Sequence, residues 1–187
     1  MLIVERPVPR HHWEPLYRML TRQVQRGNAR EVGIVRGVMV YHCNGTGAYA
    51  STGRWPSEFY FVVDVDYRPV SWMMLWHQDD WAALEVVQLW TFPAYRGAGN
   101  AARLYHAAID IDDKLIMTGS SHSTASRKLW ESFIRKQSFN IWAHEINELE
   151  ETSDVYFDDG ELQCSLPLYD DNDGVFDVRL VANRRAK

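Results

Sequence analysis

The sequence predicts an α+β fold, or α/β in the broad sense, in which a single mixed, mostly antiparallel central sheet is flanked by helices. Three observations predict it. The 187 residues are 46% hydrophobic and 24% charged, which is enough apolar material for one globular core. Short β-rich segments recur along the chain, and three segments between them have helical hydrophobic spacing. We expect one domain over residues 1–181 and a polar tail over residues 182–187.

The N-terminal part predicts a strand, a helix, a second strand and a loop. Residues 2–5 form a short apolar strand. Apolar residues between positions 13 and 24 recur every three or four positions, which indicates an amphipathic helix that ends near Gly27. Residues 32–41 are rich in Val and Ile and predict a strand. Residues 44–57 contain three Gly and one Pro, so we expect a loop there.

The middle of the chain predicts a hairpin and a central strand. Residues 58–76 hold two β-rich segments on either side of a turn at positions 66–69. Residues 82–91 are apolar on both faces, which is typical of a strand in the centre of a sheet. The turn at residues 92–99 then leads into a helix whose apolar side lies within residues 101–109.

The C-terminal part predicts a short strand, a helix and three closing strands. The short strand covers residues 114–118. Ser and Thr residues at positions 120–124 can cap the next helix, which buries apolar residues between 129 and 134. Asp159-Gly160 is a typical hairpin turn. The closing strands are expected at residues 140–146, 155–157 and 162–168.

Acidic residues are concentrated in one part of the chain. Residues 145–177 contain twelve Asp or Glu and no Lys or Arg, whereas the whole chain has a net charge of −5. This segment is either a solvated acidic face or a surface for a basic protein partner or a cationic substrate. No zinc-finger, basic-zipper or RNA-binding motif is present, so direct nucleic-acid binding is not expected.

Several other classes of protein are not expected. No apolar run approaches the roughly 20 residues that span a bilayer, and the N-terminus lacks the apolar core of a signal peptide. Cys43 and Cys164 predict two free thiols in a reducing cytoplasm. His11-His12 lacks a third ligand nearby, so no metal is expected. His122 is interpreted as a capping residue or a phosphate contact, with capping favoured.

The segment that indicates chemistry is residues 96–101, which read Arg-Gly-Ala-Gly-Asn-Ala between a buried strand and a helix. Two glycines let the backbone turn and expose successive amides, and the start of a helix adds unpaired amides and a positive dipole. Together they can hold a pyrophosphate, with Arg96 as a cation at the mouth. The alternative is a tight strand-to-helix turn without a ligand. No Gly-Lys-Ser/Thr follows, which excludes the Walker phosphate loop.

This segment matches the (Gln/Arg)-x-x-Gly-x-(Gly/Ala) signature of the GNAT superfamily of N-acetyltransferases, which the chain therefore resembles. Residues 93–95 are similar to that family's usual entry into the signature, and the order of elements over residues 1–168 is also similar. The resemblance implies a GNAT-like acyl-CoA N-acyltransferase fold. The short, Trp-rich chain further resembles GNAT-like proteins encoded by bacteriophages.

The resemblance implies acetyl-CoA as co-substrate, lying between the central strand and a neighbour that separate at a bulge. The strand residues before the turn would offer backbone groups to the pantetheine arm, the signature amides would hold the pyrophosphate, and two serines would lie at the second helix. The implied contacts are Leu89, Trp90, Thr91, Arg96, Gly97, Ala98, Gly99, Asn100, Ala101, Ser123 and Ser126.

The candidate general base is Glu85, eleven residues before Arg96, a spacing similar to that of the catalytic glutamate in histone-type members of the family. A carboxylate in an apolar strand should have its pKa raised by desolvation. The alternatives are that Glu85 points outward or pairs with Arg68 or Arg103. Asp79 and Asp80 are weaker candidates for the base.

The general acid is where the sequence departs from the family pattern. Alignment of Ser126 on the family's Ala places Ser123 on its Asn and Trp130 on the Tyr that protonates the leaving thiolate. Trp cannot supply that proton, and the family's Gly-Phe pair is missing too. Tyr105 is a poor substitute because it lies on the buried side of its helix. Either water or another residue is the acid, or the protein does not turn over.

Three functions follow as hypotheses. The first is an acetyl-CoA-dependent N-acetyltransferase acting on a primary amine of a protein or a small cationic molecule. The second is a catalytically weak or inactive GNAT-fold binding or assembly protein, such as a phage virion or host-interaction protein. The third is a coenzyme A-binding regulator without turnover. Most of the tryptophans near the central strands are expected to be core residues, namely Trp72, Trp76, Trp81 and Trp90. The alternative is that an acceptor pocket is lined by Trp72, Trp76, Tyr49 or Trp55. A homodimer could arise by exchange of the last strands.

Overall fold

The computed structural model describes residues 2–3, 10–46, 51–52, 55–77, 82–119, 121–146, 152–166 and 178–185. The chain divides into two compact units. One unit covers residues 7–114, and the other combines residues 1–6 with residues 115–187. The predicted α+β class is confirmed, because a mixed, mostly antiparallel set of strands is flanked by helices. That residues 1–181 form one domain stays a prediction.

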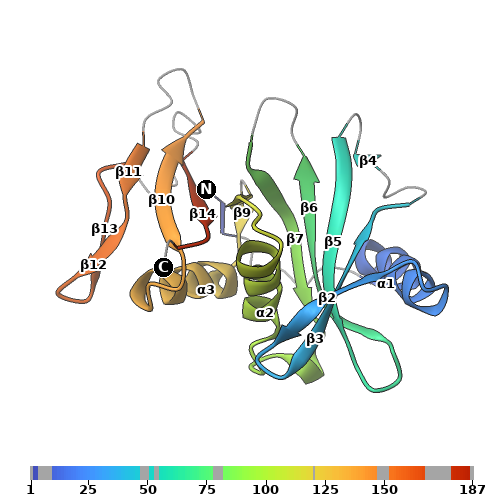
Figure 1. The fold of residues 1–187 in the computed structure, drawn as a ribbon. Helices are drawn as coiled ribbons and strands as arrows, with labels where there is room; N and C mark the ends of the chain where they lie inside the picture. The colour runs from blue at the N-terminus through green and yellow to red at the C-terminus, as the bar shows by residue number, and fades with distance from the viewer. Residues whose placement is uncertain are drawn as a thin grey trace. The chain divides into compact units, whose positions relative to one another are not determined.

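The larger unit is built on an antiparallel sheet with the strand order β2-β3-β5-β6-β7 (Figure 1). Its main strands are β2 (Arg30–Val35), β3 (Val38–Asn44), β5 (Trp55–Val63), β6 (Pro69–His77) and β7 (Leu84–Thr91). A short strand β4 (Ser51–Thr52) pairs with β5. The helices are α1 (Arg10–Gln25) and α2 (Asn100–His106), and α2 continues into the π-helical segment η3 (Ala107–Ile111).

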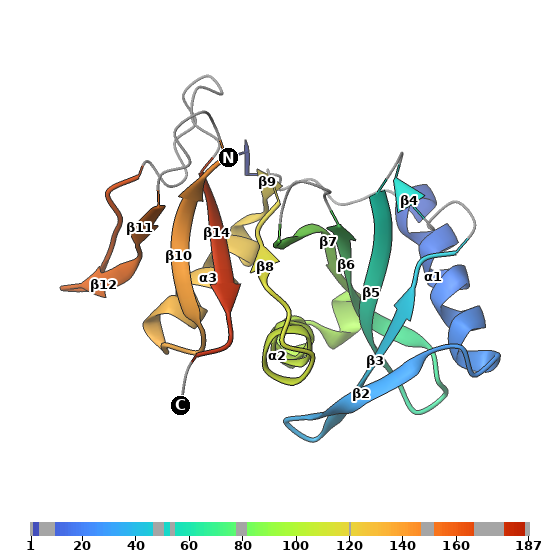
Figure 2. The same cartoon turned by 45° about the horizontal axis from the view of Figure 1, so that its top comes forward.

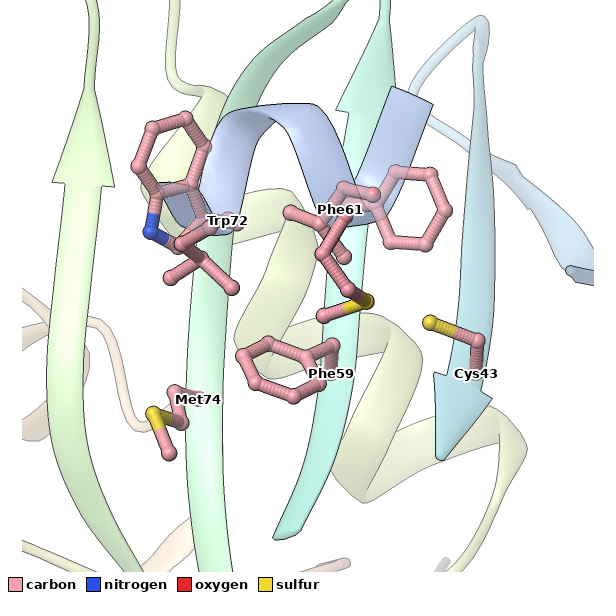
Figure 3. Packing of buried hydrophobic residues seen from close by; sticks show 8 residues of the cluster. Cys43, Phe59, Phe61, Trp72 and Met74 are labelled. Atoms are coloured by element: carbon pink, nitrogen blue, oxygen red, sulfur yellow. The ribbon is translucent and has the colours of Figure 1, made fainter. Parts of the chain in front are cut away.

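Helix α1 covers one face of this sheet. Leu16, Met19 and Leu20 of α1 pack against side chains of β3, β5 and β6 that all point to the same face. Figure 3 shows this layer, with the labelled side chains of the strands gathered beside α1. The sheet residues of the cluster are Cys43, Phe59, Phe61, Trp72 and Met74. Burial raises the pKa of the Cys43 thiol to about 12, so this cysteine is an inert part of the core.

Helix α2 and η3 cover the opposite face. Tyr60 lies between Phe59 and Phe61 in β5, so its side chain points away from α1, and its hydroxyl donates to Asp112 just after η3. Figures 1 and 2 show α1 and α2 on different sides of the sheet. Strands β5 and β6 are therefore buried on both faces, which explains why they read as continuous apolar runs rather than as alternating ones.

The smaller unit contains the second helix of the predicted pair, α3 (Thr124–Arg135), and short strands (Figure 2). Within it β11, β10, β14 and β8 are neighbours in that order and pair antiparallel. Strand β1 pairs with β9 in parallel, and β12 pairs with β13 around the predicted Asp159-Gly160 turn. The strands are β1 (Leu2–Ile3), β8 (Ile116–Met117), β9 (Ser121–His122), β10 (Asn140–Glu145), β11 (Thr152–Asp154), β12 (Tyr156–Asp158), β13 (Glu161–Gln163) and β14 (Val178–Asn183).

Several predicted boundaries were wrong. The single strand expected at residues 32–41 is a hairpin of β2 and β3, because Arg36 (φ 50°) and Gly37 (φ 79°) form a tight turn. The loop expected over residues 44–57 contains β4 and the start of β5. Ala182 and Asn183 belong to β14 rather than to the predicted tail. The expected strand at residues 162–168 extends only to Gln163, and positions 167–168 lie outside the described residues.

Within the described part of the chain, no helix is both long enough and apolar enough to cross a membrane.

The α1 face supplies a direct test of the core. Replacing Leu20, which is fully buried, with Ala should lower the free energy of unfolding by about 2–5 kcal/mol, because apolar contacts are lost and a cavity remains. Val65→Ala is the matched control, since Val65 is 94% exposed. Urea unfolding followed by tryptophan fluorescence measures both. Equal unfolding midpoints for the two variants would contradict the assignment of α1 to this core.

Candidate functional site

Strand β7 carries an irregularity in its middle. Met74 of β6 pairs with Gln88 and the next residue, Leu75, pairs with Val86, so Val87 is an extra residue in β7. A bulge is therefore present in the strand that the sequence assigns to the coenzyme. Bulges change the direction of neighbouring side chains and interrupt ladder hydrogen bonds, which makes backbone groups available to a ligand.

The segment after β7 forms a compact loop before α2. A 3₁₀ turn, η2 (Pro93–Tyr95), comes first, and Gly97 (φ 78°) and Gly99 (φ 77°) then adopt the left-handed conformation that favours glycine. Asn100 starts α2. Among the described residues, none accepts a hydrogen bond from the amides of Gly97, Ala98 or Gly99, whereas the Arg96 amide donates to the Pro93 carbonyl at 3.3 Å. Three successive amides of the signature are thus available to an acceptor.

The side chains of Asn100 and Arg103 in α2 form hydrogen bonds to backbone carbonyls of the loop. The Asn100 side chain is 6% exposed and donates to the Tyr95 carbonyl at 3.2 Å. Arg103 Nη1 donates to Asn100 Oδ1 at 2.8 Å and to the Ala98 carbonyl at 2.5 Å. Loop carbonyls are therefore satisfied by α2, while loop amides stay unbonded. The signature predicts a role for the backbone amide of Asn100. It does not predict that the side chains of Asn100 and Arg103 bind the loop carbonyls.

Arg96 places a cation beside the same loop. Its side chain is held from two directions: Nε donates to the Thr91 carbonyl at 3.1 Å, and the guanidinium carbon lies 5.6 Å from the ring centroid of Trp90. Unbonded amides, left-handed glycines and a fixed guanidinium are together the donor set that a pyrophosphate requires. The residues present thus fit the phosphate part of a coenzyme.

The other predicted strand residues lie in the last part of β7. Leu89, Trp90 and Thr91 are half-buried and pair with Met73, Trp72 and Ser71 of β6. The Ser71 hydroxyl donates to the Trp90 carbonyl at 3.0 Å and lies 2.8 Å from the Thr91 hydroxyl. Their contact with a pantetheine arm stays a prediction.

Glu85 is buried near the start of β7. It is 8% exposed and pairs with Trp76, so its side chain points to the face that α1 covers. The two arginines suggested as its partners are engaged elsewhere: Arg68 pairs with Asp66 at 3.1 Å, and Arg103 holds the loop. Glu85 is thus shielded from solvent on the strand that leads into the loop. Its role as the base stays a prediction.

The predicted residues of the second helix lie in the smaller unit. Ser123, one of the Ser and Thr residues at positions 120–124 that the sequence offered as caps, is the N-cap of α3, and its hydroxyl accepts from the Ser126 amide at 3.1 Å. Trp130 is fully buried and meets Phe133 edge-to-face with ring centroids 6.1 Å apart. Trp130 is therefore a core residue of this unit, and coenzyme contacts by Ser123 and Ser126 stay predictions.

Other predicted candidates cannot be placed. Tyr49, Asp79, Asp80 and Trp81 lie outside the described residues, as do the side chains of His11, His12, Trp55 and His122. Among the residues whose positions are described, no group of three or more His, Cys, Asp or Glu side chains could hold a metal ion.

The sequence reasoning missed a polar cluster on the α2 face of the sheet. Glu58 of β5 is 8% exposed, and its carboxylate is hydrogen-bonded by His42 at 3.0 Å and by His77. The Lys114 ammonium lies 3.5 Å from the same carboxylate. Burial by itself would raise the pKa of Glu58, but the two histidines and Lys114 outweigh it and lower the pKa to about 2.

A second carboxylate extends this cluster. Asp112 accepts from the Tyr60 hydroxyl at 2.7 Å and pairs with Arg30 at 2.5 Å. Burial alone would raise the pKa of Asp112, but the hydrogen bonds from Arg30 and Tyr60 lower it. No local signal marks the cluster, because its members come from β2, β3, β5 and β6 and the segment after η3. Only the strand register brings them together.

The Glu58 cluster predicts an acid-sensitive contribution to stability. Because the pKa of Glu58 is lower in the folded chain than its ordinary value of about 4.5, its contribution is complete above that value and is lost as the pH falls towards 2. Glu58→Gln should therefore cost about 3 kcal/mol at pH 7 and much less at pH 3. Urea unfolding of both proteins at each pH measures the difference. The same cost at pH 7 and pH 3 would contradict the assignment.

Comparison with known proteins agrees with the motif. The model of the acetyltransferase (GNAT) family matches residues 30–133, which is more than half of the chain, so the chain belongs to this family. A solved structure of a GNAT-family protein from Bacteroides thetaiotaomicron is 13% identical with a TM-score of 0.39, and the match covers 70% of this chain and 63% of that one. The chain thus spans less than two thirds of the length of that protein. The assignment to the family rests on the family model alone. No curated protein matches the chain.

Proposed function

We propose that this member of the GNAT family transfers an acetyl group from acetyl-CoA to a primary amine by direct attack. Proteins of the family use acetyl-CoA as co-substrate. The observation that carries the proposal is the loop after β7, where the unbonded amides of Gly97, Ala98 and Gly99 and the guanidinium of Arg96 lie together. The buried carboxylate of Glu85 lies on the strand that leads into this loop.

The chain's own residues would bind and orient the coenzyme. The Gly97, Ala98 and Gly99 amides would donate to the pyrophosphate, and Arg96 would balance its charge. The backbone at Leu89, Trp90 and Thr91 would contact the pantetheine arm, with further contacts from Asn100, Ala101, Ser123 and Ser126. The coenzyme supplies the acetyl group activated as a thioester, and the chain supplies orientation and electrostatics.

Glu85 would act as the general base. The attacking amine must lose a proton as its nitrogen bonds to the acetyl carbon, and a carboxylate placed beside that nitrogen can accept the proton. The sulfur that leaves must in turn gain a proton. Trp130 cannot supply one, and Tyr105 is only 1% exposed, so solvent is the proposed source of this proton.

A cationic acceptor is the proposed substrate class. In the described part of the acidic segment 145–177, Asp154, Asp158, Asp159 and Glu161 are exposed, whereas Glu145 is buried. Exposed carboxylates attract a cationic amine, or a basic protein that carries a lysine, towards this unit. A cytoplasmic location, a bacteriophage origin and a homodimer are further proposals that rest on the sequence alone.

A substitution that adds negative charge and bulk to the loop tests the proposed coenzyme site. Gly99→Glu places a carboxylate where the pyrophosphate would bind and strains a left-handed position, so acetyl-CoA binding should be lost in isothermal titration. Gly37→Glu is the matched control, because Gly37 has nearly the same φ of 79° and no atom within 4 Å of an added Cβ. Gly37→Glu should bind acetyl-CoA like the wild-type protein. Binding that survives in Gly99→Glu would refute the site.

The base is tested separately. Glu85→Gln removes the proton acceptor while it keeps the side chain's shape, so the rate of acetyl transfer should fall by about 10²–10⁴-fold with little change in acetyl-CoA affinity. Steady-state assays on a panel of amine acceptors, with titration of acetyl-CoA, measure both. Glu31→Gln, on the exposed Glu31 of β2, controls for the change in net charge. An unchanged rate in Glu85→Gln would remove Glu85 from the mechanism.

A further inference from the structure

A pocket opens in the larger unit beside the first turns of α1. Its volume is about 360 Å³, and it is formed by α1, by the turn between β5 and β6, and by the segment that follows β7. This size lies at the lower end of the range for pockets that hold small molecules. All of its lining residues belong to the larger unit. Phe92 and Tyr95, at the start of the loop after β7, line the pocket, whereas Glu85, Arg96 and the residues 97–99 do not.

Three aromatic rings form one side of this pocket. The planes of Trp13, Tyr17 and Phe92 are nearly perpendicular to one another, with interplanar angles of 89° for Trp13 and Tyr17, 88° for Trp13 and Phe92, and 90° for Tyr17 and Phe92. Their ring centroids are 4.9–6.4 Å apart. All three residues line the pocket, so this side of it is aromatic. Ring faces carry a negative quadrupole, which attracts cations.

The ionic groups that line the pocket leave one negative charge uncompensated. Glu14 pairs with Arg18 at 2.7 Å, and Arg68 pairs with Asp66 at 3.1 Å. Asp64 has no cationic partner among the described residues. Its Oδ1 accepts hydrogen bonds from the Asp66 and Arg68 amides at 2.9 Å. Within the described ranges of the chain, its Oδ2 accepts one long hydrogen bond of 3.4 Å, from the Tyr95 hydroxyl.

We propose that this pocket binds a compact alkylammonium cation of the trimethylammonium class. Such a cation spreads its charge over methyl groups that pack against aromatic rings, and one carboxylate is enough to balance it. A metal ion would need more oxygen ligands than Asp64 offers, and an anion would be repelled by Asp64. A neutral apolar ligand would leave the Asp64 carboxylate unpaired. A quaternary nitrogen has no lone pair to acetylate, so this ligand is separate from the amine that the proposed reaction modifies.

The test compares two molecules of the same shape. Choline carries the trimethylammonium group, and 3,3-dimethylbutan-1-ol replaces its nitrogen with carbon and has no charge. Isothermal titration of the full chain should show saturable binding of choline, with the neutral analogue at least about tenfold weaker because cation–π and charge attraction are missing. Equal binding of the two molecules, or no binding of choline, would overturn the proposal.

Two substitutions assign the binding to this pocket. Asp64→Asn removes the charge but keeps an oxygen that can accept the two turn amides, so choline should bind about tenfold more weakly while the neutral analogue is unaffected. Asp113→Asn is the control for net charge, because Asp113 is exposed, does not line the pocket, and has a φ of 53° that Asn tolerates. Unchanged choline affinity in Asp64→Asn would overturn the proposal.

A second variant covers the case in which Asp64→Asn disturbs the turn. Trp13→Leu removes an aromatic wall while it keeps an apolar side chain, and it should also weaken choline binding by severalfold. Circular dichroism confirms that each variant is folded. Because the readout is binding of choline, it does not depend on acetyl-CoA or on turnover. Failure of the coenzyme test would therefore leave this result intact, and choline binding that persists in a folded Trp13→Leu would overturn the pocket assignment.

Discussion

Burial of both faces of β5 and β6 is the constraint on which the larger unit depends. Phe59 and Phe61 face α1, while Tyr60 between them faces the segment that follows α2. A strand pair covered on both sides cannot shift its register by one residue without moving aromatic rings and polar groups to the wrong faces. The position of β7, which pairs with β6 along its length, follows from this constraint.

The loop after β7 follows from the same arrangement. Strand β7 is held by its pairs with β6 up to Thr91, and the chain must then turn back so that α2 covers the sheet. Gly97 and Gly99 make that turn possible, and the buried Asn100 side chain and Arg103 take up loop carbonyls. Among the described residues, the amides of Gly97, Ala98 and Gly99 have no hydrogen-bond acceptor. A phosphate-binding surface can thus arise from a turn whose carbonyls are satisfied and whose amides are not.

Two buried carboxylates of this unit have different environments. Glu58 lies among His42, His77 and Lys114, and these groups stabilise its charged form so strongly that it serves as a fixed anion. Glu85 lies on the opposite face beside Trp76. Because the pKa of Glu58 is low, its carboxylate accepts a proton only at low pH and stays charged near neutrality, which suits a structural role. Glu58 therefore shows that burial alone does not identify a catalytic carboxylate.

The sequence by itself determined the features that depend on neighbouring residues. The Gly-rich signature, the Ser123 cap, the hairpin at residues 58–76 and the Asp159-Gly160 turn are local, because their conformations depend on glycine freedom, capping and alternation over a few positions. Only the tertiary structure decided the face of Glu85, the partners of Glu58, the hold of Arg103 on the loop and the extent of β14. These depend on strand register and on contacts between residues far apart in the chain, which no local pattern encodes.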